Sequence, residues 1–341
     1  MSARADVGGA DAQADVGDGD AQADVGGADD AQADGARDTA PDVTSDVGGD
    51  AAAPTAIELK APTFTAAKSS QSTQCVVLDL GNAQAIHVGH VKTTLSAPVY
   101  EVRIGAVTGA VQATPTTCTA FGDIMDAAVR PLVFARNDVE DLSFPAGVGY
   151  TLAPHQLLRV EIHTWNPTND DLPANVSTIF TVSKDADFQH EAGLLLLENL
   201  EVQIAAGAQT VQLGPQFFPL SATLGAASIF RLEGYTHELG VDLAMSLATG
   251  ATDPAPTSIY APAPWNPANP LVVDEATPRT VPANGGIALT CKWNNANGST
   301  PVQRGPSVMD ERCAAFVSYY PAVAARTCLH MGNGTGPTVC L

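Results

Sequence analysis

The stretch LLRVEIHTWNP, residues Leu157–Pro167, decides the fold class. Successive residues of an extended chain point to opposite faces. One face of this stretch carries Val160, Ile162 and Thr164, and the other carries Glu161, His163 and Trp165. This alternation predicts a β-strand.

Similar segments of strand length recur from about Ile57 onward, bounded by Gly, Pro, Asn and Asp. They are CVVLDL (75–80), VYEVRIGAV (99–107), STIFTV (177–182), GLLLLENLEVQI (193–204), GIALTCKW (286–293) and AAFVSYY (314–320). Helical periodicity is scarce, and GDIMDAAVR (122–130) is a short helix candidate. Many short strands with Gly/Pro turns are typical of antiparallel sandwiches and jelly rolls.

The chain of 341 residues is long enough for two ordinary domains. We therefore predict an all-β protein with two tandem antiparallel β-sandwich (jelly-roll-like) domains behind a disordered acidic leader. The expected bounds are 1–55 for the leader, 56–190 for the first sandwich and 191–341 for the second.

The leader is a repeat with an unusual composition. It contains ADVGGADAQ, ADVGDGDAQ and ADVGGADDAQ, and residues 1–50 hold thirteen Asp, two Arg and no aromatic residue. Such a segment has nothing to bury and repels itself. We predict a lipoprotein-like linker that tethers a folded head to a surface. A calcium-binding repeat is the weaker alternative, because the G-G-x-G-x-D pattern is absent.

The overall charge excludes one class of partner. Of the formal net charge of −21, −10 belongs to residues 51–341, which is an ordinary acidic surface. Binding to nucleic acid is not expected, because phosphates need concentrated Lys and Arg. The sequence has no run of 18 apolar residues, so no transmembrane helix is predicted.

Six cysteines lie outside the leader, and none forms a CxxC pair. An even number scattered through a Thr-, Ser- and Pro-rich chain indicates disulfides and an oxidising compartment. We expect a secreted or cell-envelope protein, although no export signal is visible at the N-terminus.

The segment LEGYTHELG (232–240) places Tyr235 and His237 two residues apart. On a strand both side chains point to one face. An H-x-H pair on a strand would predict a metal site. The segment therefore looks like a metal motif whose first ligand is replaced.

Four stretches, in order, together resemble the copper type II ascorbate-dependent monooxygenases, the family of peptidylglycine α-hydroxylating and dopamine β-hydroxylating enzymes. They are SFPAGVGYTL (143–152) with LLRVEIHTWNP, KDADFQHEAGLLLLEN (184–199), EGYTHELG (233–240) and TCKWNNANGSTPVQRGPSVMDERCAAFVSYYP (290–321). The resemblance implies two β-sandwiches, each with one copper, facing each other across a wet cleft. One copper passes an electron and the other activates O₂ for C–H hydroxylation, with ascorbate as the reductant.

The resemblance also assigns ligand positions. The electron-transfer copper, with three His in the family, falls on Tyr100, Glu101 and His163. The O₂ copper, with two His and a Met, falls on Tyr235, His237 and Arg312. Two of these six ligand positions, His163 and His237, keep the family residue and are the candidate metal ligands. The family's substrate-binding Arg and Tyr fall on Glu233 and Phe316.

Cysteine pairing follows from the same resemblance. It suggests Cys75–Cys118 and Cys291–Cys313, which leaves Cys328–Cys340 to hold the C-terminus. Six cysteines permit 15 pairings, so this is one choice among many.

The chemistry of the replacements predicts impaired or lost copper binding. A single imidazole leaves a weak copper site, and Arg312 places a positive charge where a thioether belongs. The first hypothesis is an exported family member with its copper chemistry impaired or lost, which would be catalytic only if further ligands joined His163 and His237. The second is a non-catalytic binding or surface module that takes a small molecule, peptide or glycan. The third is a site for another metal with oxygen ligands from Tyr100, Glu101 and Glu238.

Other side chains are weaker candidates for metal ligands. His87 and His90 point to opposite faces of a strand, although a turn would let them converge. His155 and His190 lie near predicted loops. The sulfur-containing alternatives are Met309, as a substitute for Arg312, and Met331 beside His330.

Overall fold

The computed structural model describes residues 56–119, 128–324, 327–331 and 336–341. The predicted leader, residues 1–55, lies outside the described residues, as do residues 122–127 of the short helix candidate. Arg130, the last residue of that candidate, begins a strand. The regular secondary structure of the described residues is almost entirely strands, which confirms the predicted all-β class.

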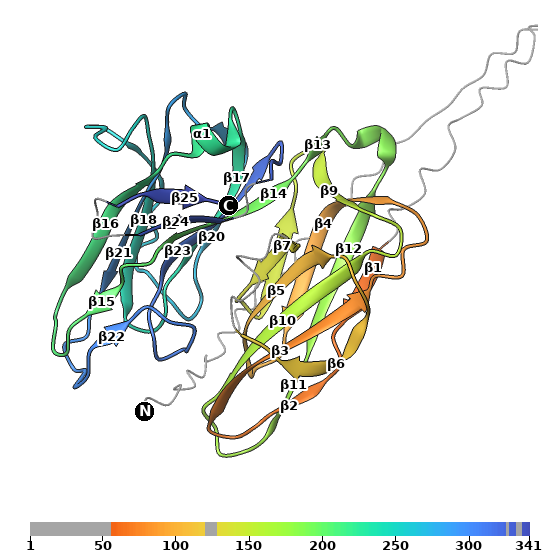
Figure 1. Cartoon of the computed structure of the whole chain (residues 1–341), viewed down its shortest axis with the longest axis horizontal. Helices are drawn as coiled ribbons and strands as arrows, with labels where there is room; N and C mark the ends of the chain where they lie inside the picture. Colours follow the sequence, from red (N-terminus) through yellow and green to blue (C-terminus); the bar gives the residue numbers. More distant parts are fainter. Residues whose placement is uncertain (1–55, 120–127, 325–326, 332–335) are drawn as a thin grey trace, which may run out of the picture. The chain divides into compact units, whose positions relative to one another are not determined.

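Residues 56–191 form two main sheets and a small one (Figure 1). The first sheet has the order β1 (Ala56–Lys60), β12 (Val176–Ser183), β4 (Ile86–Leu95), β9 (Val148–Leu152) and β13 (His190–Glu191), with β8 (Val139–Ser143) also paired to β4. The second has the order β6 (Gln112–Thr117), β3 (Ser70–Asp79), β10 (Leu157–Asn166), β5 (Val99–Val107) and β7 (Arg130–Ala135). The small sheet pairs β11 (Leu172–Ala174) with β2 (Phe64–Ala66).

Residues 193–340 form a second set of sheets. One has the order β20 (Val272–Thr280), β17 (Ser228–Tyr235), β23 (Cys313–Tyr320), β14 (Gly193–Asn199), β24 (Thr327–His330) and β25 (Thr338–Cys340). The other has the order β16 (Val211–Phe218), β21 (Gly286–Trp293), β18 (Gly240–Ala248) and β19 (Thr257–Tyr260), beside the pair β15 (Gln203–Ile204) and β22 (Val302–Gln303). The described helices are one turn of 3₁₀-helix (Asp185–Asp187) and α1 (Leu220–Leu224).

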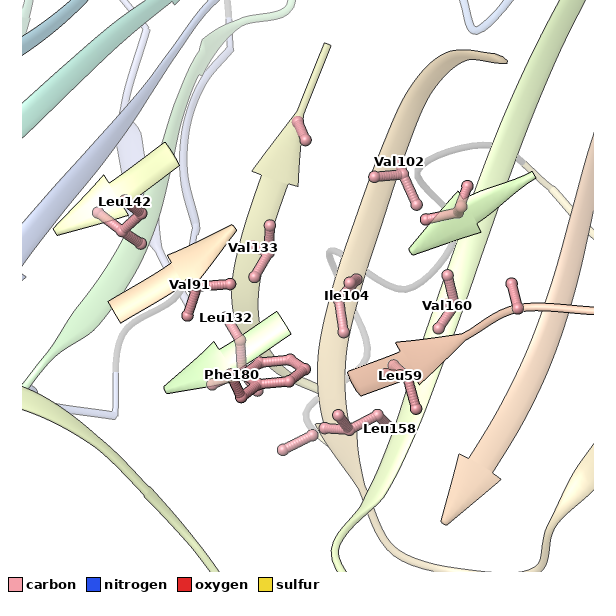
Figure 2. Close-up of a cluster of buried hydrophobic side chains, with 14 of the residues drawn as sticks. Leu59, Val91, Val102, Ile104, Leu132, Val133, Leu142, Leu158, Val160 and Phe180 are labelled. Carbon is pink, nitrogen blue, oxygen red and sulfur yellow. The ribbon is translucent and has the colours of Figure 1, made fainter. Parts of the chain in front are cut away.

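Each set of sheets encloses a hydrophobic core. Figure 2 shows part of the first, where Phe180 and Val91 meet Ile104 and Val160 from the facing sheet. The second core joins β14, β17 and β23 to β18 and β21. Facing sheets bury their inner side chains together, which is the stabilising arrangement of a β-sandwich.

The strand β10, which the opening stretch predicts, lies inside its sheet. It pairs antiparallel with β3 on one side and β5 on the other. Val160 and Ile162 enter the core, as alternation predicts. The opposite face is also buried, with Glu161 2% and His163 4% exposed. Polar residues on a buried face need partners, and these come from the neighbouring strand β5, where Arg103 pairs with Glu161 and Glu101 lies 3.7 Å from His163.

Three disulfides are present, between the pairs that the family resemblance suggested. They join Cys75 to Cys118, Cys291 to Cys313 and Cys328 to Cys340. Each crosslink reduces the freedom of the unfolded chain, typically contributing about 2–4 kcal/mol. No helix within the described residues is long and apolar enough to span a membrane.

The buried ring of Phe180 provides a test of the first core. Replacing Phe180 with Ala removes a ring that is 0% exposed and leaves a cavity. We expect the free energy of unfolding to fall by about 3–5 kcal/mol in urea titrations. The control Val111→Ala alters a side chain that is 55% exposed and should change stability by less than about 0.5 kcal/mol. Equal effects of the two substitutions would contradict the packing described here.

Candidate functional site

The six ligand positions come together in one buried cluster. Tyr100 and Glu101 lie on β5, His163 on β10 and Tyr235 at the end of β17. His237 follows β17 and Arg312 precedes β23. All except the half-buried Tyr100 are at most 4% exposed. The two groups of positions, which the family keeps apart, are therefore in contact here.

A β-bulge explains how two consecutive residues join the same cluster. His163 lies opposite Glu101, while the next residue, Thr164, lies opposite Val99. The register skips Tyr100, so this residue is the extra one. A bulge redirects side chains that would otherwise point to opposite faces. The ring centroids of Tyr100 and His163 are consequently 5.7 Å apart.

The hydroxyl of Tyr235 connects the two groups. It lies 2.5 Å from Glu101 Oε2 and 2.7 Å from His237 Nε2. On the far side of the imidazole, His237 Nδ1 lies 2.9 Å from the carbonyl oxygen of Asp310. At the other end, Glu101 Oε1 lies 3.7 Å from His163 Nδ1, within ion-pair distance. A continuous polar chain thus runs from His163 to Asp310.

The contacts of His237 define its protonation. Burial lowers the pKa of His237 to about 3, and the positive charge of Arg136 acts in the same direction. The imidazole is therefore neutral at neutral pH. A carbonyl oxygen only accepts hydrogen bonds, so Nδ1 donates to Asp310. Nε2 of the neutral ring then accepts from the Tyr235 hydroxyl.

The carboxylate of Glu101 is buried and negatively charged. Burial raises its pKa, but the contact with His163, the charge of Arg103 and the hydrogen bond from Tyr235 outweigh burial, and the pKa falls to about 2. Burial and the nearby Glu101 charge raise the pKa of Tyr235 well above 10. Tyr235 therefore keeps its proton, a single proton between two acceptors, Glu101 and His237.

Arg136, just after β7, crosses to the second set of sheets. Its Nη1 donates to the carbonyl oxygen of Thr236 at 2.6 Å, and its Nη2 donates to the Tyr100 hydroxyl. The guanidinium carbon also lies 4.5 Å from the ring centroid of Tyr100 and 5.0 Å from that of Tyr235. Cation–π contacts of this kind are favourable within about 6 Å. Arg136 therefore links both sides of the cluster.

Arg312 is held by a carboxylate from β14. Its Nε and Nη2 donate to the two oxygens of Glu198 at 2.9 and 2.7 Å. Arg304 donates to the same oxygens at 2.9 and 3.1 Å. Arg312 and Glu198 are each 1% exposed. A planar guanidinium matches a carboxylate in this two-point geometry.

The cluster does not offer a copper site of the family type. Both ring nitrogens of His237 face hydrogen-bonding partners, and Arg312 has no lone pair to donate. Near His163 the other donors are the oxygens of Tyr100 and Glu101, which suit hard cations better than Cu(I). Within the described ranges, no three His, Cys, Asp or Glu side chains are arranged to hold a metal ion.

The two histidines of β4 make separate contacts. His87 stacks on Phe188 with ring centroids 3.8 Å apart. His90 Nε2 lies 2.7 Å from Asp141 Oδ1. The bulge in this strand lies between them, at the shift in pairing to β12. They do not converge on a common point.

The remaining candidates also lie apart from the cluster. His190 stacks on Tyr320, and His155 pairs with Asp79 in a loop. Met309 is 73% exposed and Met331 41% exposed, while His330 is buried. Glu238 is exposed. We find no shared site among these residues.

The two substrate positions face a cavity instead of a substrate cleft. Glu233 and Phe316 line a space of about 20 Å³, enough for about one water molecule. Phe316 stacks on Phe134 with ring centroids 3.7 Å apart. Burial raises the pKa of Glu233 to about 8, with Arg231 and Arg136 opposing it. Glu233 is therefore mostly protonated at neutral pH.

Sequence reasoning missed three members of the cluster. They are Arg136, Glu198 and Glu311. Glu311 accepts from the backbone N–H of His237 and from Trp293 Nε1, both at 2.9 Å. Burial raises its pKa to about 7. A charged residue at the end of an apolar run, as in PLVFAR (131–136) or LLLLE (194–198), was an available signal.

Comparison with known proteins matches residues 220–336 to the family described as "Copper type II ascorbate-dependent monooxygenase, C-terminal domain". The chain has no match among curated proteins.

Similar solved structures have low scores. The STIV MCP is 11% identical, with 79% of this chain and 93% of that chain covered and a TM-score of 0.30. Infectious bursal disease virus, Gx strain, is 10% identical, with 84% of this chain and 74% of that chain covered and a TM-score of 0.21. A fucolectin from striped bass (Morone saxatilis) serum is 8% identical, with 76% of this chain and 86% of that chain covered and a TM-score of 0.15. TM-scores this low support no statement about this chain.

The Arg312–Glu198 pair can be tested by substitution. Arg312→Met removes one partner and leaves a buried carboxylate with only Arg304. We expect a loss of about 3–5 kcal/mol in unfolding free energy, measured in urea. The double variant Arg312→Met/Glu198→Gln should recover most of this loss. Arg304→Met, at a side chain 36% exposed, should cost clearly less than Arg312→Met. An equal cost would argue against the pairing.

The raised pKa of Glu233 predicts that the stability of the folded protein depends on pH. Its pKa is raised from 4.5 to about 8 in the folded protein, so the folded state holds a proton that the unfolded state has lost. Stability therefore falls as pH rises through this window. Glu233→Gln should remove that fall, by up to about 1.4 kcal/mol per pH unit, in unfolding titrations at several pH values. The exposed control Glu238→Gln should not. A pH-independent difference would contradict the assignment.

Proposed function

We propose that this chain, whose residues 220–336 match the C-terminal domain of the copper type II ascorbate-dependent monooxygenase family, is a member of that family whose copper chemistry is lost. The ligand positions hold the two sandwiches together. The paired sandwiches then serve as a non-catalytic binding module. The proposed division is a linker at 1–55 and sandwiches at 56–190 and 191–341.

The hydrogen bond between Glu101 and Tyr235 carries the proposal. These residues occupy an electron-transfer position and an O₂ position of the family. Their oxygens are 2.5 Å apart, so the side chains bond to each other instead of facing a solvent-filled gap. A substrate has no room between groups in hydrogen-bond contact.

The donor chemistry supports the same conclusion. Copper that alternates between Cu(I) and Cu(II) needs several imidazole or sulfur ligands. His163 and His237 are the imidazoles at the six ligand positions, and Glu101 and Tyr235 lie between them in the polar chain. The guanidinium of Arg312 adds a fixed positive charge that repels a metal ion. Ascorbate would have no oxidised copper to reduce.

Two other functions remain as alternatives. A copper enzyme would need ligands beyond His163 and His237, and would need His237 to release a hydrogen bond. A site for a hard cation would use the oxygens of Tyr100, Glu101 and Glu238. Neither alternative accounts for the direct contact between Glu101 and Tyr235.

The location of the protein is part of the proposal. Three disulfides support an oxidising compartment. We infer a secreted or cell-envelope protein whose acidic linker holds the folded part away from a surface. Its partner is a small molecule, peptide or glycan, and an acidic chain argues against nucleic acid.

Copper content tests the proposal directly. The full chain is loaded with Cu(II), or with Cu(I) under reducing conditions that leave disulfides intact, and then dialysed. Copper per chain is measured by mass spectrometry, beside the double variant His163→Ala/His237→Ala. We expect the wild type and the double variant to retain the same background amount. One or two coppers per wild-type chain, absent from the variant, would refute the proposal.

A restored variant provides the positive control. Tyr100→His/Glu101→His rebuilds three histidines at the first position, and Tyr235→His/Arg312→Met rebuilds the second set. Copper gained by either folded variant, checked by near-UV circular dichroism, shows that the assay detects copper at these positions.

A further inference from the structure

We propose that a cleft at the edge of the two sandwiches binds an extended, positively charged segment of a partner protein. The cleft lies between β8 and the chain that leads into β20. This proposal rests on the proposed binding role and names the site and the class of partner. It concerns residues outside the six ligand positions.

The cleft has the size of a binding site. Its volume is about 360 Å³, within the range of about 300–1,000 Å³ that is usual for ligand sites. One wall carries Asn137 and Asp141 at β8. The other carries Asn269, Leu271 and Asp274, before and within β20. Both walls therefore come from strands and connections that the structure describes on different sandwiches.

The charge of the cleft favours a cation. Its charged lining residues are Glu140, Asp141, Asp274 and Arg231, so three negative charges and one positive charge sum to −2. The side chains of Asp141 and Asp274 are 53% and 56% exposed, so they can meet a ligand. His90 faces Asp141 from outside the cleft and offsets part of this charge when protonated.

Arg231 does not offer an anion site at the base of the cleft. Its side chain is 8% exposed. Nη1 donates to the carbonyl oxygen of Asp141 at 2.8 Å and to Asp274 Oδ1 at 2.9 Å, and Nη2 donates to Glu140. Both terminal nitrogens are thus committed to protein oxygens. Arg231 instead fixes the two walls relative to each other.

The rim favours a peptide over other cations. Val139 and Leu271 are each 50% exposed, and Pro262, Pro264 and Pro270 also line the cleft. These apolar surfaces can pack against aliphatic side chains or lysine stems. On the same wall, Asn137 Nδ2 donates to Glu140 Oε2 at 3.1 Å.

Other occupants fit less well. No aromatic side chain lines the cleft, so a sugar ring has no stacking partner. The carboxylates repel nucleic acid and anionic lipid. The chain's own residues 1–50 carry thirteen Asp against two Arg, so this segment is repelled as well. The charge therefore points to a basic segment of another protein.

Fluorescence anisotropy with a labelled, end-blocked peptide of alternating Lys and Val tests the proposal on the full chain. We expect saturable binding that weakens at high salt, and no binding of the same peptide with Glu in place of Lys. Asp141→Asn/Asp274→Asn should weaken binding at least about tenfold, which is about 1.4 kcal/mol. Leu271→Ser, at an exposed position, should also weaken it.

A matched control removes the same charge elsewhere. Asp185→Asn/Asp187→Asn neutralises two exposed carboxylates on the turn between β12 and β13 and should leave the affinity unchanged. Hydrogen exchange should show protection in 137–141 and 262–274 when peptide is bound. Equal weakening by both double variants, no binding of the Lys peptide, or binding of a neutral oligosaccharide in its place would overturn the proposal.

The proposed loss of copper chemistry and the proposed binding of a basic segment can be refuted independently. Stoichiometric copper in the same preparation would refute the loss of copper chemistry and leave the peptide result standing. Absence of peptide binding with background copper would refute the basic-segment site alone.

Discussion

The burial of Glu101 beneath Tyr235 is the constraint on which the relation between the two sandwiches depends. A carboxylate that is 1% exposed is costly to remove from water unless it is paired and hydrogen-bonded. Its partners come from both sides: His163 and Arg103 from its own sheet, and the Tyr235 hydroxyl from the other sandwich. Separating the sandwiches would remove the last of these. The outer faces of the two central sheets therefore pack against each other.

Other buried charges near the contact between the sandwiches also need partners. Arg312 is buried because Glu198 meets it at two points, and Arg136 because it finds a carbonyl oxygen, a hydroxyl and two aromatic rings. A buried ion pair contributes little net stability, but the loss of one partner is expensive. Apolar contacts from Phe134 and Phe316 fill the space beside these polar groups. The positions that the resemblance assigns to metal ligands thus connect the two sandwiches, and we expect single changes there to destabilise the protein.

The contact between the two sandwiches also limits the open space between them. Two cavities between the described parts of the central sheets have volumes of about 20 and 30 Å³, enough for about one water molecule each. The larger cleft lies at the margin, where Arg231 spans Glu140 of one sandwich and Asp274 of the other. The proposed binding role places the partner at this open acidic edge and not between the central sheets.

Local patterning was sufficient to predict strands such as β5, β10 and β23, because alternation and turn residues act over a few neighbours. Tyr235 and His237 are in contact as expected, but the strand predicted over both ends at Tyr235, and His237 lies in the connection that follows. The family resemblance supplied the disulfide pairs and the six ligand positions. The bulge that redirects Tyr100 depends on the register between β5 and β10, and Glu198 meets Arg312 across 114 residues of chain. Only the tertiary structure decides such contacts, because a buried charge takes whichever partner packing brings within hydrogen-bond distance, whatever the separation in sequence.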